Sequence, residues 1–226
     1  MDTKASIVEI ETIIQNAFID EPFHNFHLLD EKTSNHCGGT CSDKSLSVLR
    51  SIQGAGYKAN LHSANIGGQK DIHRLVKVHI NKKEYFADVG NGWPSLKLYP
   101  LDHEVSYSSF GMQFFTQIDE KKLIVCHTKN GKTNSDLEIY LECKSETEIM
   151  TDIDNRFSSS KEYPFSNSRR FSKIVGDEFL FLRGSRLEIY KEGRAKASII
   201  EDISESDLPD ILLRYFNFDI CKFTAV

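Results

Sequence analysis

The chain has 226 residues, with 28 Lys and Arg against 33 Asp and Glu, and a net charge of −5 at neutral pH. This acidic balance argues against nucleic acid as the main partner. No apolar run approaches the ~20 residues of a membrane span, so no membrane partner is expected. A chain of this length can bury a substantial core, either as one large domain or as two or three small ones packed together.

Cysteine usage indicates the compartment. The five cysteines, at positions 37, 41, 126, 143 and 221, are odd in number and lack the spacing of a disulfide framework. The first residues, MDTKASIVEIETII, lack the cationic and apolar regions of a signal peptide. A cytoplasmic protein is therefore expected. In a reducing compartment each cysteine must be explained by packing, metal binding or catalysis rather than by crosslinking.

The N-terminal part of the sequence has helical periodicity. Apolar residues over 6–18 form a helical stripe, which Glu21-Pro22 ends. A second stripe at Leu46, Leu49 and Ile52 stops at glycines 54 and 56 and places Cys41 at or just before its first turn. Residues 1–56 are thus predicted to form a helical domain that carries Cys41.

The pattern then changes to strands. Segments 57–66, 72–80, 83–89, 110–118, 121–128 and 136–143 predict an antiparallel sheet or barrel over residues 57–144, with turns at 81–83 and 128–134. Ser145 and Glu148 form a capping-box pattern for a helix over 145–157. Strands over 171–175, 178–182, 186–190 and 197–203 and a closing helix over 204–216 complete an α/β lid domain, 145–226. The fold class is α+β.

Cys41 is the first candidate for chemistry. A thiol attacks as its thiolate, and a free cysteine with a pKa of ~8.5 is mostly protonated at neutral pH. A helix start favours the anion, a neighbouring imidazole can take the proton, and Gly38-Gly39 would let the backbone turn sharply before Cys41. The alternatives are a buried structural thiol, a disulfide with Cys37, and a zinc clip with His36 and Cys37 that lacks a fourth ligand.

A histidine held by a carboxylate would complete a nucleophilic site. His73 begins one predicted strand, Asp88 ends the next, and the turn at 81–83 makes the two strands hairpin neighbours. His62 or His79 could replace His73, although His79 lies beside the turn and away from Asp88. Asp88 could instead be a turn residue that accepts backbone N–H bonds before Gly90.

These residues, in this order, resemble the arylamine N-acetyltransferase family. The likeness runs from EPFHNFHLL at 21–29 through Gly-Gly-x-Cys at 38–41, HRLVKVHI, FADVGNG and LYPL to the hairpins and closing helix of the tail, as in a divergent member with a shortened N-terminal helical block. The family carries a Cys-His-Asp triad on a cysteine-protease-like core. The resemblance assigns the nucleophile to Cys41, the base to His73 and the orienting carboxylate to Asp88.

The resemblance also implies the reaction. An acyl group from acetyl-CoA would pass to Cys41 and then to an arylamine, hydrazine or related amine, by a ping-pong mechanism and without a metal. The loop after the triad aspartate lies near the CoA phosphates in the family. The residues expected on the cofactor side are therefore Gly90, Asn91, Gly92 and Trp93.

The sequence departs from the family at two positions. Cys37 stands where the family has an arginine before Gly-Gly, and Asn91 replaces a phenylalanine that lines the acceptor pocket in the family. The acceptor could therefore be a different amine, or the acyl donor other than acetyl-CoA. The basic residues of 168–170 and 191–196 could contact CoA phosphates, but solvated surface is the favoured interpretation.

Two other functions use the same residues. A transglutaminase-like or papain-like thiol hydrolase or amide synthase has the same triad order but transfers the acyl group to water or a protein lysine. A catalytically degenerate binding module would keep the fold without turnover.

Overall fold

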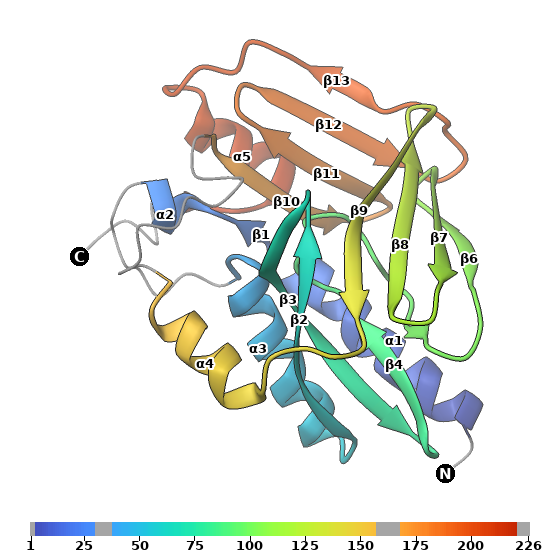
Figure 1. The fold of residues 1–226 in the computed structure, drawn as a ribbon. Coiled ribbons are helices and arrows are strands. Elements are labelled where there is room, and N and C mark those ends of the chain that lie inside the picture. Colours follow the sequence, from blue (N-terminus) through green and yellow to red (C-terminus); the bar gives the residue numbers. More distant parts are fainter. Residues whose placement is uncertain (1–2, 30–37, 157–167, 221–226) are drawn as a thin grey trace.

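Figure 1 shows the fold in a computed structural model, which describes residues 3–29, 38–156 and 168–220, apart from the side chain of Asp136. The chain forms two antiparallel sheets with helices packed on them. The predicted α+β class is confirmed, with an N-terminal helix, a curled antiparallel half-barrel and a C-terminal helix. In the described part of the chain, no helix is long and apolar enough to cross a membrane.

The two helices predicted near the N-terminus are present. Helix α1 (Thr3–Asp20) buries one apolar stripe that includes Ile10, Ile14 and Phe18. Helix α3 (Cys41–Gly54) packs beside it, and the buried Lys44 Nζ of α3 donates a hydrogen bond to the Ala17 carbonyl in the last turn of α1 (2.6 Å). A cation at this end of α1 satisfies an otherwise unpaired carbonyl and opposes the negative end of the helix dipole.

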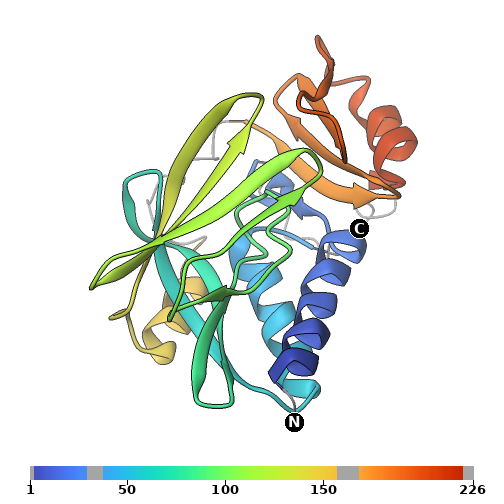
Figure 2. The same ribbon diagram turned by 90° about the vertical axis from the view of Figure 1, so that its right-hand side faces the viewer.

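The larger sheet has the strand order β5-β4-β3-β2-β9-β8-β7-β6. The strands of this sheet curl around the helices α1 and α3 in Figures 1 and 2. They are β2 (Lys58–Ile66), β3 (Gln69–Ile80), β4 (Lys83–Ala87), β5 (Tyr99–Pro100), β6 (Ser106–Ser109), β7 (Met112–Ile118), β8 (Lys122–Lys129) and β9 (Lys132–Tyr140). All six predicted strands are confirmed, while β5 and β6 were not predicted. Strand β3 begins earlier than expected and places His73 inside the strand rather than at its start.

The smaller sheet has the order β1-β10-β11-β12-β13. It consists of β1 (Phe23–His24), β10 (Arg170–Val175), β11 (Glu178–Arg183), β12 (Arg186–Lys191) and β13 (Ser198–Ile200), with α5 (Leu208–Phe216) on its outer side in Figure 2. The short helix α2 (Phe26–Leu29) follows β1. The sequence did not predict β1, because a two-residue strand is too short to show a period.

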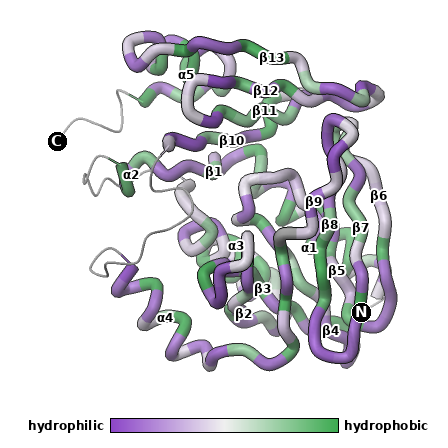
Figure 3. Tube along the Cα trace, turned by 45° about the horizontal axis from the view of Figure 1, so that its top comes forward, coloured by the Kyte–Doolittle hydropathy of each residue, from purple (hydrophilic) through white to green (hydrophobic). Residues whose placement is uncertain are grey.

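Two elements connect parts of the chain that are distant in sequence. Strand β1 pairs with β10, so the N-terminal segment belongs to the C-terminal sheet. Helix α4 (Glu146–Asp154) packs against β2 through its buried residues Ile149 and Ile153, and Figure 3 shows the hydrophilic residues that make up most of the rest of α4. The division into domains at residues 56 and 144 remains a prediction.

Candidate active site

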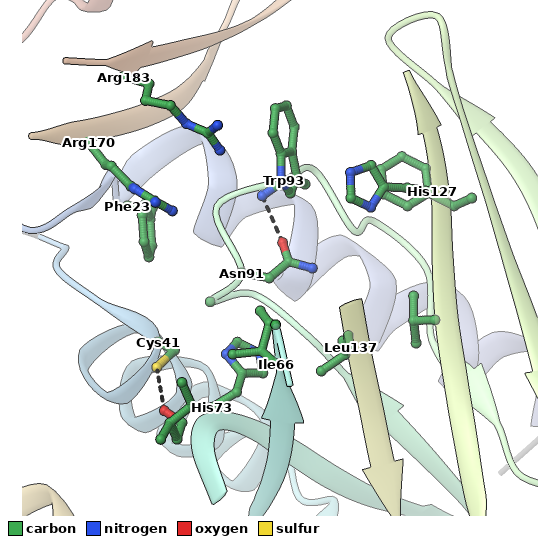
Figure 4. A pocket seen from close by; sticks show the side chains of 15 residues that line it. Phe23, Cys41, Ile66, His73, Asn91, Trp93, His127, Leu137, Arg170 and Arg183 are labelled. Atoms are coloured by element: carbon green, nitrogen blue, oxygen red, sulfur yellow. Dashed lines mark hydrogen bonds between the residues drawn. The ribbon is translucent and has the colours of Figure 1, made fainter. Parts of the chain in front are cut away.

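Cys41 is the first residue of helix α3, as the sequence predicts. The preceding Thr40 donates its backbone N–H to Asp43 Oδ2 (2.9 Å), and Arg156 Nη2 holds Asp43 Oδ1 at 2.6 Å. These contacts fix the helix start and therefore the position of the thiol. Cys41 has a free thiol and is 5% exposed, with its Sγ 3.9 Å from the Ile72 carbonyl oxygen (Figure 4).

Glycines shape the backbone around the thiol. Gly39 has φ +135°, donates its N–H to the Pro22 carbonyl (3.1 Å) and accepts from the His24 N–H (2.9 Å), so it ties the loop before α3 to β1. Gly90 comes from the loop after β4. A Cβ at Gly90 would overlap the Cα and Cβ of Cys41, so only glycine lets this loop lie directly against the thiol-bearing residue.

The structure brings His73 and Asp88 together. His73 Nε2 lies 2.9 Å from Asp88 Oδ1, and the two side chains are 2% and 0% exposed. The same Asp88 oxygen accepts the Gly90 N–H at 3.1 Å. The hairpin of β3 and β4 therefore makes the predicted contact. The alternative role of Asp88, a turn residue that accepts a backbone N–H, occurs at the same time.

The electrostatics of the three residues favour an ion pair. Burial by itself would raise the pKa of the Cys41 thiol, but the hydrogen bond and the charge of His73 outweigh burial and lower it. Burial alone would lower the pKa of His73, while the charge and hydrogen bond of Asp88, with a further contribution from Cys41, raise it. Because Asp88 occupies Nε2, the Nδ1 atom of His73 is left for the thiol. This arrangement stabilises a thiolate beside an imidazolium.

The two alternative histidines lie elsewhere. His62 Nε2 is bonded to the Tyr140 carbonyl (2.8 Å), and its Nδ1 lies 3.1 Å from the Cys143 Sγ. His79 lies 3.6 Å from a Glu84 carboxylate oxygen. Neither histidine replaces His73 beside Cys41.

One cavity opens onto Cys41 and His73 (Figure 4). Its walls combine residues of both sheets, the first residue of α3, the turn between β2 and β3, and the loop after β4. The lining residues are Phe23, Cys41, Ile66, Gly67, Ile72, His73, Gly90, Asn91, Trp93, Phe114, Val125, His127, Leu137, Arg170 and Arg183. The cavity is thus partly apolar and aromatic, with two guanidinium groups at the side formed by the smaller sheet.

The loop predicted to face the cofactor lies at this cavity. Gly90, Asn91 and Trp93 line it, and the Asn91 Oδ1 accepts the Trp93 N–H (2.7 Å). Gly92 is not a lining residue. Its carbonyl accepts a hydrogen bond from the Ser172 hydroxyl (2.8 Å), which joins the loop to β10. Although Asn91 is polar, the Trp93 ring supplies an aromatic wall at the same loop.

Sequence reasoning missed the residues that come from the far sides of the cavity. His127 belongs to β8, while Arg170 and Arg183 belong to β10 and β11. Arg170 was expected on the solvated surface, but it lines the cavity, because the pairing of β10 with β1 brings it above the start of α3. The sequence predicted the strands of the hairpin 171–182, but it did not predict which face of that hairpin turns towards Cys41.

The zinc hypothesis falls mostly outside the described residues, since His36 and Cys37 do so. Within the described ranges, no group of three or more His, Cys, Asp or Glu residues could hold a metal ion.

Comparisons with known proteins agree with this fold. A family model described as N-acetyltransferase matches residues 24–224. No curated protein sequence matches the chain. Among solved structures, the arylamine N-acetyltransferase of Mycobacterium abscessus is 14% identical with a TM-score of 0.79, covering 97% of this chain and 86% of that one.

Two further structures are similar. The arylamine N-acetyltransferase of Mycobacterium marinum has a TM-score of 0.79 at 13% identity, covering 98% of this chain and 90% of that one. An arylamine N-acetyltransferase of Bacillus cereus, with a Cys-His-Glu catalytic triad, has a TM-score of 0.70 at 16% identity, covering 92% of this chain and 89% of that one. The structures support the fold and the family model covers most of the sequence, so this chain belongs to the arylamine N-acetyltransferase family of enzymes.

Proposed function

We propose that this enzyme transfers an acetyl group from acetyl-CoA to an amine, either an arylamine or a hydrazine, through an acetyl-cysteine at Cys41. One observation carries the proposal: Cys41, His73 and Asp88 form a buried, hydrogen-bonded series whose thiol end opens into a cavity. In the similar Bacillus cereus protein, a cysteine, a histidine and a carboxylate form the catalytic triad.

In the first half-reaction the Cys41 thiolate forms a bond to the acetyl carbonyl carbon. The imidazolium of His73 gives its proton to the departing thiolate of CoA as the C–S bond breaks. Backbone N–H groups at the start of α3, including that of Cys41, are placed to stabilise the tetrahedral oxyanion. Asp88 keeps the imidazole oriented and stabilises its positive charge.

In the second half-reaction the neutral His73 accepts a proton from the attacking amine. The amine nitrogen bonds to the acetyl carbon, and Cys41 leaves as the thiolate that His73 stabilises once it is protonated again. The low exposure of the three side chains limits the access of water to the thioester. Gly90, Asn91 and Trp93 are proposed to contact the donor, and the Trp93 ring also offers an aromatic surface to the acceptor. Gly92 is proposed to hold this loop in place, because its carbonyl is bonded to the Ser172 hydroxyl.

The test is to incubate the protein with acetyl-CoA and to analyse its peptides by mass spectrometry. We expect one acetyl group on the Cys41 peptide, its removal when an arylamine or hydrazine is added, and complete loss of transfer in Cys41→Ala. The Cys143→Ala variant is the matched control, because Cys143 also contacts a histidine, and it should keep transfer. Cleavage of a peptide or isopeptide bond without an acetyl-Cys41 adduct would instead favour the thiol hydrolase.

A further inference from the structure

A row of three arginines crosses the smaller sheet. The register of β10, β11 and β12 places Arg170 directly opposite Arg183, and Arg183 directly opposite Arg186. Directly opposed residues in antiparallel strands project from the same face of a sheet, and like charges in this arrangement destabilise it. Such a row needs negative charge nearby.

Arg186 receives this charge from side chains of its own sheet. Arg186 Nε lies 3.2 Å from Glu188, and its Nη1 donates to Glu201 at 2.9 Å. Arg183 makes no ion pair with any residue that the structure describes, and its guanidinium lies 5.6 Å from the centre of the Phe181 ring. The structure therefore balances Arg186 and leaves the charge of Arg183 for another group.

Arg170 and Arg183 line the same cavity as Cys41 and His73 (Figure 4). The lining residues include no Asp or Glu, and all of them are described. A further cation stands beside the cavity, since Lys129 Nζ lies 3.2 Å from the centre of the Trp93 ring. This part of the cavity is thus rich in positive charge and poor in negative charge.

Two pKa shifts agree with this charge distribution. Burial, followed by the charge of Arg183, lowers the pKa of Arg170. Burial and the charge of Lys129 lower the pKa of His127 to about 4, so this histidine is neutral at pH 7. An anion in the cavity would relieve the repulsion that contributes to both shifts.

We propose that Arg170 and Arg183 together bind an anionic group of a substrate. The inference rests on the acyl transfer proposed above and specifies its substrates. Two adjacent guanidinium groups can each form paired hydrogen bonds to carboxylate or phosphate oxygens. Two sources fit this chemistry, a carboxylate on the acceptor amine and a phosphate of CoA.

Binding can be tested without turnover, because Trp93 is the only tryptophan of the chain and lines the cavity. Its fluorescence is titrated with benzoate, with the neutral analogue benzamide, and with CoA. We expect the double variant Arg170→Gln/Arg183→Gln to weaken benzoate or CoA binding roughly 10- to 100-fold and to leave benzamide binding unchanged. Arg186→Gln, which removes the balanced arginine of the same row, should bind like the wild type.

Kinetics then identify the source of the anion. If the group is the acceptor carboxylate, the double variant loses kcat/KM for 4-aminobenzoate but not for 4-aminobenzamide. If it is a CoA phosphate, the variant loses kcat/KM for acetyl-CoA but not for S-acetyl-N-acetylcysteamine, which has no phosphate. Either result supports the anion site. Loss of less than about twofold in both comparisons and in the benzoate and CoA titrations would overturn it.

Two controls keep the outcomes separate. Arg183→Lys keeps the positive charge but not the planar, two-pronged guanidinium group. Compared with Arg183→Gln it should restore part of the binding, whereas a loss caused by unfolding would not be rescued. The acetyl-Cys41 adduct is also measured in the wild type with acetyl-CoA. If no adduct forms there, the proposed acyl transfer fails, while the benzoate and CoA titrations still decide whether the anion site exists.

Discussion

Two cysteine–histidine pairs of the described structure, Cys41–His73 and Cys143–His62, differ in the group behind the histidine. In the first pair the Cys41 thiol contacts His73, whose Nε2 lies 2.9 Å from a carboxylate oxygen of Asp88. In the second, the Cys143 Sγ lies 3.1 Å from His62 Nδ1, and the Nε2 of that ring is bonded to a backbone carbonyl. The pairs have the same two side chains but different third partners.

The third partner decides the charge of the imidazole. Burial is the largest influence on both histidines and by itself lowers both pKa values. At His73 the charge and hydrogen bond of Asp88 reverse the shift, and the pKa is raised. At His62 the hydrogen bond of the carbonyl does not outweigh burial, and the pKa stays lowered. A thiol beside an imidazole therefore needs the carboxylate to form a stable ion pair.

Among variants that keep both members of the first pair, the largest effect is expected from Asp88→Asn, which makes the first pair resemble the second. An amide has no charge to hold the imidazolium and can favour the wrong tautomer of His73. We expect acyl transfer to fall on the order of 10²- to 10⁴-fold, with protein folding retained. Steady-state rates with acetyl-CoA and an arylamine measure this loss.

Asp71→Asn is the matched control for this variant. Asp71 lies on the same strand as His73, and its carboxylate accepts a hydrogen bond from Ser63 rather than from a histidine. Its amide analogue can still accept that bond, so transfer should remain near the wild-type rate. Equal losses in the two variants would show that the hairpin, and not the charge at position 88, sets activity.

A smaller effect is expected from Gly90→Ala, which disturbs the geometry of the first pair without removing any of its groups. The new methyl group would overlap the Cα and Cβ of Cys41, so the thiol must shift relative to His73. We expect acyl transfer to fall roughly 10- to 100-fold and the free energy of unfolding to fall by about 1–3 kcal/mol. Acylation rates and denaturant unfolding measure these two changes.

Gly54→Ala serves as its control, since it lies in the helix that bears Cys41 and a Cβ there meets no atom within 4 Å. This variant should keep both activity and stability. If Gly90→Ala were as active as Gly54→Ala, the close packing of the loop on Cys41 would not matter for catalysis.

His127 extends the comparison to a histidine that makes no ion pair with any carboxylate of the described residues, and its loss should affect transfer least. Its Nε2 is buried without a hydrogen-bond partner in the described structure, and its pKa of about 4 lies below the ~6.5 of an unfolded chain. Between these values the unfolded state binds more protons, so the stability that depends on neutral His127 is lost as the pH falls from 6.5 towards 4.

The His127→Gln variant should therefore lose less stability on acidification than the wild type. We expect the difference to grow to about 1–3 kcal/mol at pH 4 and to vanish above pH 7. Denaturant unfolding of both proteins at several pH values measures it. If the free energy of unfolding changed with pH in the same way in both proteins, His127 would not be held neutral by the fold.

Local patterns predicted the residues of the first pair. The apolar stripe of α3 and its glycines placed Cys41 at a helix start. The predicted hairpin, with its turn at 81–83, brought His73 close to Asp88. These contacts depend on short-range periodicity, and a single sequence is enough to reveal it. The same reasoning left His62 and His79 as alternatives, and only the three-dimensional contacts excluded them.

The rest of the cavity could not be predicted, because it depends on the packing of distant elements. The pairing of β1 with β10 turns one face of the smaller sheet towards Cys41, and this pairing brings Arg170 into the wall. A two-residue strand shows no period, and the face that a hairpin buries is set by its partner. Cys37, the position where the family has an arginine, lies outside the described residues.

The most direct test of the ion pair is the pH dependence of alkylation at Cys41 and Cys143 in the same sample. Iodoacetamide labelling is followed by peptide mass spectrometry, and the midpoint of each rate profile is compared, since absolute rates also depend on exposure. We predict a Cys41 midpoint below the ~8.5 of an ordinary thiol, and a rise of the Cys41 midpoint in Asp88→Asn. A Cys41 midpoint at or above that of an ordinary thiol, or one that does not change in Asp88→Asn, would contradict the account.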